Sequence, residues 1–183
     1  MKHTSSISRL GAALLFSLVA ASASAQKPQV YVNQNLGFNV EGFNYAQSNF
    51  PCEIDKVLVE SLVAQGNSQG LNMEAVGTAD KIRNGVIPVL DIDVEQLILG
   101  EKYKFGTRSK SNLPMVKVTA ALITSSEDFV SAKHSCAIAT LNEFTPSSNV
   151  LDMGTTATVC AATRKCLNDL SKDIVQWIEP QLK

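Results

Sequence analysis

Histidine is almost absent from this chain, which has two in 183 residues, His3 and His134. Only His134 lies beyond the first 25 residues, so a Ser-His-Asp or Cys-His catalytic arrangement would have to use it. A transition-metal site would also lack ligands if the cysteines are bridged. His134 alternates in phase with Val130 and Cys136, which should face the helices. We therefore interpret it as a hydrogen-bonded histidine in the core or at its rim.

A run of roughly 20 apolar residues, long enough to span a membrane, is missing as well. The apolar stretch Leu10–Ala20 is shorter, follows the basic residues Lys2 and Arg9, and precedes the small residues 23–25 (Ala-Ser-Ala). This order is typical of a secretory signal peptide that is cleaved. The new N-terminus would be Gln26, which offers no cysteine for a lipid anchor. We expect the leader to be removed and the remainder to be a soluble periplasmic or secreted protein.

Dense clusters of one charge sign are absent. The 16 Lys and Arg against 17 Asp and Glu give a formal charge of −1, and losing Lys2 and Arg9 would change it to −3. The chain therefore shows no electrostatic footprint for nucleic acid or for an anionic membrane. Removing 25 of the 183 residues leaves 158, a length that suits one domain over residues 26–183. No internal repeat or low-complexity linker divides it.

The four cysteines contain no C-x-x-C pair, which leaves a thioredoxin-like redox role without support. They are Cys52, Cys136, Cys160 and Cys166. An even number in an exported chain predicts two structural disulfides with three possible connectivities; the alternative is one bridge and two buried thiols. On one helix, Cys160 and Cys166 would stand about 9 Å apart along the axis, too far to bond each other. Either each reaches Cys52 or Cys136, or the last helix begins later than predicted.

Hydrophobic periodicity predicts two amphipathic helices, at 51–65 and at 157–179. Pro51 suits the first turn of the first helix and Gly66 its end. Strands are predicted at 29–33, 71–76, 86–99, 115–124 and 129–141, the last two forming a hairpin. Pro88 cannot donate to a strand ladder, so it should lie at an edge or at a strand start. Loops are predicted at 36–49, with room for a short strand, and at 101–112 and 142–155.

The element order is β-α-β-β-β-β-α, and both helices need a surface to cover. The economical arrangement is an α/β fold of the α+β two-layer sandwich type. In it, a mixed sheet of four to five strands carries both helices on one face. The first strand–helix–strand unit should cross over with the right hand.

Three parts of the chain carry a resemblance to known proteins. They are the helix Cys52–Gln65 leading through Gly70 to Leu71–Val76, the strand Val86–Leu99, and the hairpin MVKVTAALITSSEDFVSAKHSCAIA. Their order resembles bacterial envelope domains related to the N-terminal domain of TolB. Similar domains occur in the curli-secretion lipoprotein, in outer-membrane activators of penicillin-binding proteins and in ABC-transport auxiliary lipoproteins. The resemblance implies non-enzymatic recognition in a cell envelope and assigns no individual site residue.

Alternating carboxylates mark the longest predicted strand. Asp91, Asp93 and Glu95 should project from one face of it, about 7 Å apart. Such a ladder can hold a hard cation or supply an acid/base pair. The favoured interpretation is the solvent face of a half-buried strand, because alternation is the ordinary signature of one.

Two further groups are candidate contact residues. The first is a set of aromatic residues concentrated between positions 31 and 50: Tyr31, Phe38, Phe43, Tyr45 and Phe50. They belong either to a loop that contacts a ligand or partner or to a segment packed over the sheet edge. The second is a basic group in the 101–112 loop: Lys102, Lys104, Arg108 and Lys110, with Tyr103 and Phe105. This group either contacts an acidic partner or forms a solvated loop tip.

These observations support three functions in decreasing order. The first is a non-catalytic envelope module that binds a protein or peptide, with no cofactor, through an exposed sheet edge. The second is a carrier for a small apolar or amphipathic ligand. The third is a hydrolase or cation site built on Asp91, Asp93 and Glu95.

Overall fold

The computed structural model describes residues 27–38, 51–100, 103–106, 115–125, 128–138 and 152–182. The strands in this part are β1 Gln29–Asn33, β2 Gly37–Phe38, β3 Asn72–Val76, β4 Val89–Gly100, β5 Tyr103–Gly106, β6 Met115–Ile123 and β7 Phe129–Ala137. The helices are α1 Ile54–Ser68, α2 Ala79–Ile82 and α3 Asp152–Ile178, with 3-10 turns at Pro51–Glu53 and Glu179–Leu182.

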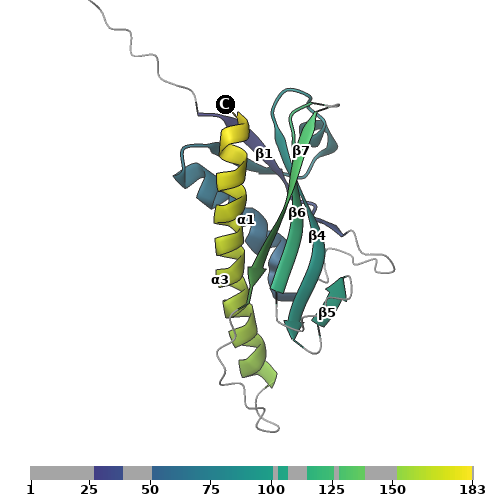
Figure 1. Ribbon diagram of the computed structural model, residues 1–183, viewed down its shortest axis with the longest axis vertical. Helices are drawn as coiled ribbons and strands as arrows, with labels where there is room; N and C mark the ends of the chain where they lie inside the picture. Colours follow the sequence, from purple (N-terminus) through teal and green to yellow (C-terminus); the bar gives the residue numbers. More distant parts are fainter. Residues whose placement is uncertain are drawn as a thin grey trace, which may run out of the picture.

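One mixed sheet organises these strands (Figure 1). Its main path runs β3-β1-β4-β6-β7, and the short strands β2 and β5 also pair with β4. Pairing is parallel from β3 through β1 to β4 and antiparallel from β4 through β6 to β7. This confirms the predicted α/β sandwich and the predicted order of its main elements.

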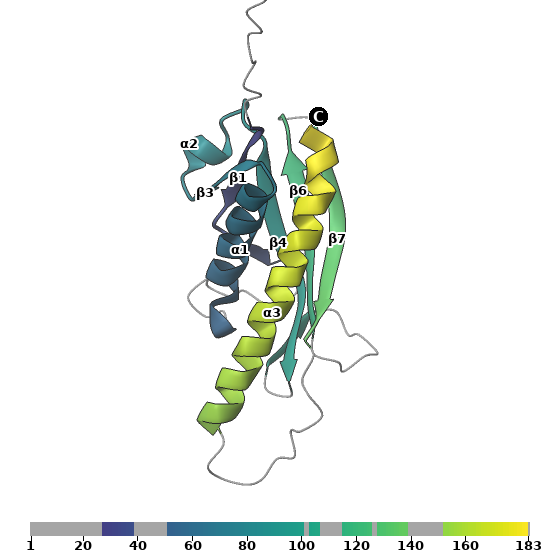
Figure 2. The same cartoon turned by 90° about the vertical axis from the view of Figure 1, so that its left-hand side faces the viewer.

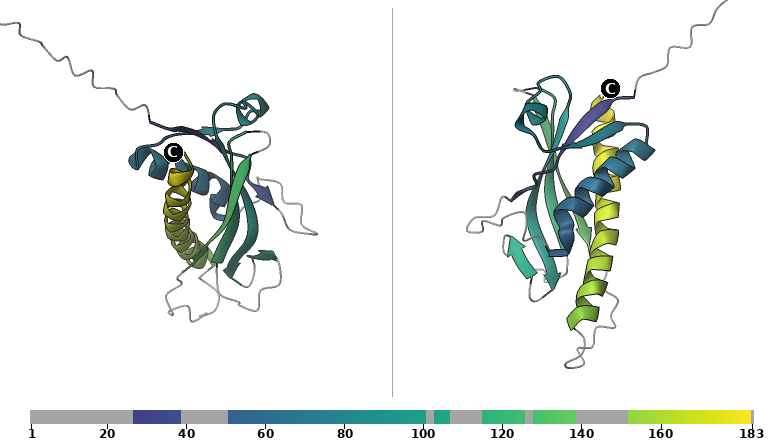
Figure 3. Two further views of the ribbon diagram at one scale, coloured as in Figure 1. Left: turned by 45° about the horizontal axis from the view of Figure 1, so that its top comes forward. Right: turned by 180° about the vertical axis from the view of Figure 1, so that it is seen from behind.

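The two long helices pack side by side on the same face of the sheet (Figures 2 and 3). The burial pattern of β6 explains why the helices cover one face, because every second residue of this strand is buried and the others are half-exposed. The side chains turned toward the helices are fully buried: Val116, Val118, Ala120 and Leu122. α3 contributes a matching apolar stripe that includes Leu167, Leu170 and Ile174. The core therefore lies between one sheet face and two helices.

The end of α1 differs from the prediction. Gly66 does not stop the helix, which continues to Ser68. Gly66 is buried instead, and a Cβ there would meet the side chain of Met73 on β3, so this glycine allows close approach of helix and strand. The stop is Gly70, whose φ of +90° is left-handed, with the Leu71 amide donating to the Gly66 carbonyl at 3.0 Å. This is a Schellman cap.

Three other element boundaries were predicted wrongly. The predicted loop 101–112 contains strand β5, which pairs with β4. α3 begins at Asp152, inside the segment predicted as a loop. β4 begins at Val89 rather than at position 86, and the carbonyl of Pro88 accepts from the Tyr31 amide at 2.9 Å. Pro88 thus precedes the strand, as its missing N–H requires. The short helix α2 was not predicted.

Both predicted disulfides are present, and both end on α3. Cys52 is bonded to Cys160 and Cys136 to Cys166, with Cα–Cα distances of 5.2 and 5.4 Å. Cys160 and Cys166 therefore do not pair with each other, which agrees with their predicted separation along one helix. One bridge ties α3 to the turn before α1, and the other ties it to β7.

We expect the Cys52–Cys160 bridge to stabilise the fold more than Cys136–Cys166. Their sequence separations are 108 and 30 residues, and loop-closure entropy gives about 4.8 and about 3.6 kcal/mol respectively. Urea unfolding of the double variants Cys52→Ala/Cys160→Ala and Cys136→Ala/Cys166→Ala measures this difference. The first should unfold at the lower urea concentration, and reductant should lower the wild-type midpoint. The reverse order, or a midpoint insensitive to reductant, would contradict the account.

Candidate functional site

The last strand of the sheet, β7, is an edge. It pairs with β6 over its whole length, from Phe129 opposite Ile123 to Ala137 opposite Met115. Within the described residues, no strand pairs with its other side. A strand at a sheet edge presents unpaired N–H and C=O groups that can bind another chain.

The hairpin turn determines which backbone groups of β7 face outward. The Thr124 amide donates to the Asp128 carbonyl at 3.0 Å, which makes this a hydrogen-bonded pair. Because such pairs alternate in an antiparallel ladder, Val130, Ala132 and the following even-numbered residues point their N–H and C=O toward β6. The outward-facing groups therefore belong to the odd-numbered residues: Phe129, Ser131, Lys133, Ser135 and Ala137.

Two large apolar side chains are exposed at the start of this edge. Phe129 is 67% exposed and Val130 is 41% exposed. Neither is needed by the described core, so together they offer an apolar anchor beside a row of free backbone groups. No aromatic cluster in the sequence indicated this position, because Phe129 lies alone at the start of its strand.

The inner side of β7 is covered by α3. His134 is 7% exposed, and its Nδ1 lies 2.6 Å from Oδ2 of Asp173. Since a carboxylate accepts, Nδ1 carries the proton. The imidazole also meets the ring of Trp177 edge-on, with centroids 5.4 Å apart, while Nε2 is buried with no partner in the described structure. The Asp173 hydrogen bond and the Trp177 contact agree with the prediction of a hydrogen-bonded histidine in the core or at its rim.

The sheet face away from the helices carries three carboxylates on β4. Asp91, Asp93 and Glu95 share this face, as predicted, and Asp91 accepts from Nδ2 of Asn33 at 2.9 Å. Glu95 accepts a hydrogen bond from Thr119 and salt bridges from Lys133 at 2.9 Å and Lys117 at 3.4 Å. A cation bound at this ladder would have to displace two ammonium groups.

Two neighbouring carboxylates of the ladder, Asp93 and Glu95, have opposite electrostatic environments. The pKa of Glu95 is lowered from 4.5 to about 2, first by the Thr119 hydrogen bond and then by Lys133 and Lys117. The pKa of Asp93 is raised above 3.8, first by burial and then by the negative charges of Asp91 and Glu95. Asp93 packs against Gly37 of β2, where a Cβ would collide with it.

Most of the predicted aromatic set lies outside the described residues, including Phe43, Tyr45 and Phe50. Phe38 ends β2, where its backbone pairs with Val94. Tyr31 is half-buried on β1, with the ammonium of Lys81 5.5 Å from its ring centroid. Lys104, Tyr103 and Phe105 lie on β5, and the other basic candidates of this loop lie outside the described residues: Lys102, Arg108 and Lys110.

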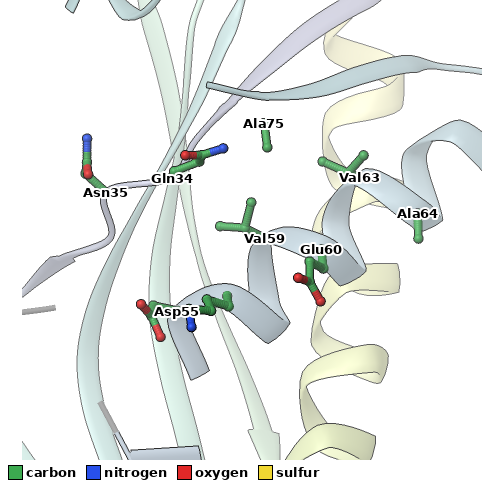
Figure 4. Close-up of a pocket in the computed structure, with 9 residues that line it drawn as sticks. Gln34, Asn35, Asp55, Val59, Glu60, Val63, Ala64 and Ala75 are labelled. Atoms are coloured by element: carbon green, nitrogen blue, oxygen red, sulfur yellow. The ribbon is translucent and has the colours of Figure 1, made fainter. Parts of the chain in front are cut away.

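A groove of about 550 Å³ lies along α1, on the side next to β3 and the end of β1. Figure 4 shows Val59 and Ala75 directed toward each other across it. We call it the α1 groove, and its lining is Gln34, Asn35, Asp55, Lys56, Val59, Glu60, Val63, Ala64 and Ala75. No local sequence pattern indicates this groove, because it joins residues from three separate parts of the chain.

Two other kinds of site are absent from the described part of the chain. No helix there combines the length and apolar character of a membrane span. No group of three or more histidine, cysteine, aspartate or glutamate residues there is arranged to hold a metal ion.

Comparison with known proteins identifies no family. No family model matches the chain, and no curated protein matches it. Among solved structures, a Xanthomonas campestris protein of family DUF330 is 18% identical, covers 84% of this chain and 87% of its own, and has a TM-score of 0.43. The PelC dodecamer from Paraburkholderia phytofirmans is 18% identical with coverages of 80% and 90% and a TM-score of 0.37.

Rare lipoprotein B from Shewanella oneidensis is 11% identical, with coverages of 84% and 95% and a TM-score of 0.35. The likenesses are too distant to carry a function to this chain, and membership of the TolB-related group stays a prediction.

We expect Glu95→Gln to destabilise the protein at neutral pH and to lose that effect in acid. A carboxylate with a lowered pKa stabilises the fold above its unfolded value of 4.5, and this contribution disappears as the pH falls to about 2. Urea midpoints of wild type and variant should therefore differ most at pH 7 and converge between pH 4.5 and 2. A difference that does not change with pH would contradict the ionic role of Glu95.

The neighbouring substitution Asp93→Asn should have the opposite sign. A raised pKa means that ionised Asp93 costs stability, so its removal should raise the urea midpoint at pH 7. The gain should fade as the pH falls toward the ordinary value of 3.8 and should be absent below it, where Asp93 is protonated in both states. A loss of stability at pH 7 would show that Asp93 has a favourable partner.

Proposed function

We propose that this protein is an exported, non-catalytic interaction module that binds a partner polypeptide as an added strand along β7. The observation that carries the proposal is the free edge of β7, with outward backbone groups on five alternating residues beside exposed Phe129 and Val130. Strand addition uses such an edge for affinity and flanking side-chain contacts for specificity. Residues 26–183 would act as a single domain.

Export is supported by two independent features. The leader has the charge and hydrophobic pattern of a signal peptide, and both disulfides need an oxidising compartment to persist. We therefore place the mature protein in the periplasm or outside the cell.

The partner of β7 should differ from β7 itself. Lys133 is the central residue of the strand and its one cation, since β7 reads FVSAKHSCA. An antiparallel pair of two β7 strands in symmetric register would set two Lys133 side chains opposite each other, which is unfavourable. A lysine in the middle of an edge strand is a common feature that disfavours self-association of sheets. A different chain with an acidic or neutral residue at that position avoids the repulsion.

The partners of two candidate acid–base groups support non-catalytic action. The described histidine is held by Asp173 beneath α3, and Glu95 is engaged by Thr119 and two lysines. These are the two places where the sequence offered general acid–base chemistry, and both have structural partners. Binding is the activity that the described surface supports.

Ser131→Pro tests the edge directly. The Ser131 N–H faces away from β6, so proline removes one outward donor while the internal ladder keeps its hydrogen bonds. Partner capture from envelope extract should fall at least tenfold, and the urea midpoint should change little. The matched control Ser131→Ala loses the hydroxyl but keeps the N–H, so it should bind like wild type.

A second control checks the assignment of inward and outward residues. Ala132→Pro removes an N–H directed at β6, so it should lower the urea midpoint clearly. The proposal is wrong if Ser131→Pro captures its partner as well as wild type does. It is also wrong if Ser131→Ala loses capture to the same extent.

A further inference from the structure

The α1 groove has an apolar floor and an acidic mouth. Val59 is 5% exposed and belongs to the core, while Val63 and Ala75 are partly buried and pack against it. These three side chains form the floor. Asp55 and Glu60 also line the groove, and because they are five residues apart on α1, about 140° around its axis, they flank it on two sides.

Among the described residues that line the groove, two carboxylates stand against one cation. No hydrogen bond or ion pair joins Asp55 or Glu60 to another residue in the described part of the chain. The one cation of the lining, Lys56, lies 3.0 Å from Glu53, which is outside the groove. The pKa of Lys56 is raised chiefly by that Glu53 hydrogen bond, and only weakly by Asp55 and Glu60.

A neighbouring groove provides a contrast. It lies between α1 and α3 and is lined by Glu53 and Glu60 but also by Lys56 and Arg164. Its acids and bases are equal in number, so it has no preference for a ligand of one sign. The α1 groove differs in having more described acids than bases beside its apolar floor.

We infer that the α1 groove binds a peptide segment that carries lysine or arginine beside an aliphatic side chain. The aliphatic group would lie on Val59 and Ala75, and the cation would meet Asp55 and Glu60. The volume falls in the range of small-molecule and peptide pockets, and a few placed charges over an apolar floor are what give such sites their specificity. The acidic mouth disfavours anionic ligands.

This groove is separate from the edge proposed above. It adjoins β3 and β1 at one side of the sheet, whereas β7 is the last strand at the other. The protein therefore has two faces that can be occupied at once, and each can be tested without the other.

Peptide titration with matched variants tests the groove. The probes are two fluorescein-labelled hexapeptides, one alternating lysine with leucine and one alternating glutamate with leucine. Fluorescence anisotropy should show binding of the lysine peptide alone. Asp55→Asn/Glu60→Gln should weaken it roughly tenfold, because each exposed charge pair contributes modestly.

Two controls separate the groove from bulk charge and from the β7 edge. Asp80→Asn/Asp169→Asn removes the same net charge from α2 and α3 and should leave affinity unchanged. Ala75→Leu, which fills the groove, should weaken binding with little change in urea midpoint, and Ser131→Pro should not affect it. The inference is overturned if the lysine peptide does not bind, if both peptides bind equally, or if the Asp80/Asp169 variant weakens binding as much as the groove variant.

Discussion

The apolar stripe of α3 is buried against the antiparallel half of the sheet, and the rest of the molecule depends on that contact. Leu167, Leu170 and Ile174 are at most 1% exposed, and each such side chain contributes about 1.5–3 kcal/mol of burial. Two disulfides, one to the turn before α1 and one to β7, keep the helix in register with both neighbours. The His134–Asp173 hydrogen bond and the Trp177 contact add a polar and an aromatic link to the same strand.

This arrangement explains why β7 can remain an edge without being loose. Its inner side chains are held by α3, and its inner backbone groups pair with β6. On the open face, Lys133 reaches across β6 to Glu95 on β4, so the outer strand is also tied through its side chains. What remains available is the outward row of backbone groups and the exposed start of the strand. A pre-ordered edge lowers the entropy that a binding partner would otherwise have to overcome.

The sequence predicted the features that follow from periodicity. Alternation located β4, β6 and β7, and the spacing of Val159, Cys166, Leu170 and Ile174 located α3. The pairing of Asp91, Asp93 and Glu95 on one polar face also followed from a period of two. The predictions that were wrong concern features that depend on tertiary contacts. β5 is a strand because it pairs with β4. Gly66 allows close approach of α1 to Met73 and does not end the helix.

The candidate sites could be predicted from the sequence less completely than the fold. The disulfide pairing required the position of α3, since composition left three connectivities open. The α1 groove joins α1, β3 and the segment after β1, and no local pattern reports such a juxtaposition. The free edge was foreseen as a kind of surface, but its assignment to β7 needed the strand order. The aromatic residues that drew attention in the sequence lie mostly outside the described part.

Amide hydrogen exchange along β7 tests the central claim most directly. In the free protein, the amides of Val130, Ala132 and His134 should be protected, while those of Ser131, Lys133 and Ser135 should exchange fast. Such alternation is expected if β7 is held on its inner side by β6 and α3 and open on its outer side. Equal, strong protection of all six amides would mean that something already covers the edge, and uniformly fast exchange would mean that α3 does not hold the strand.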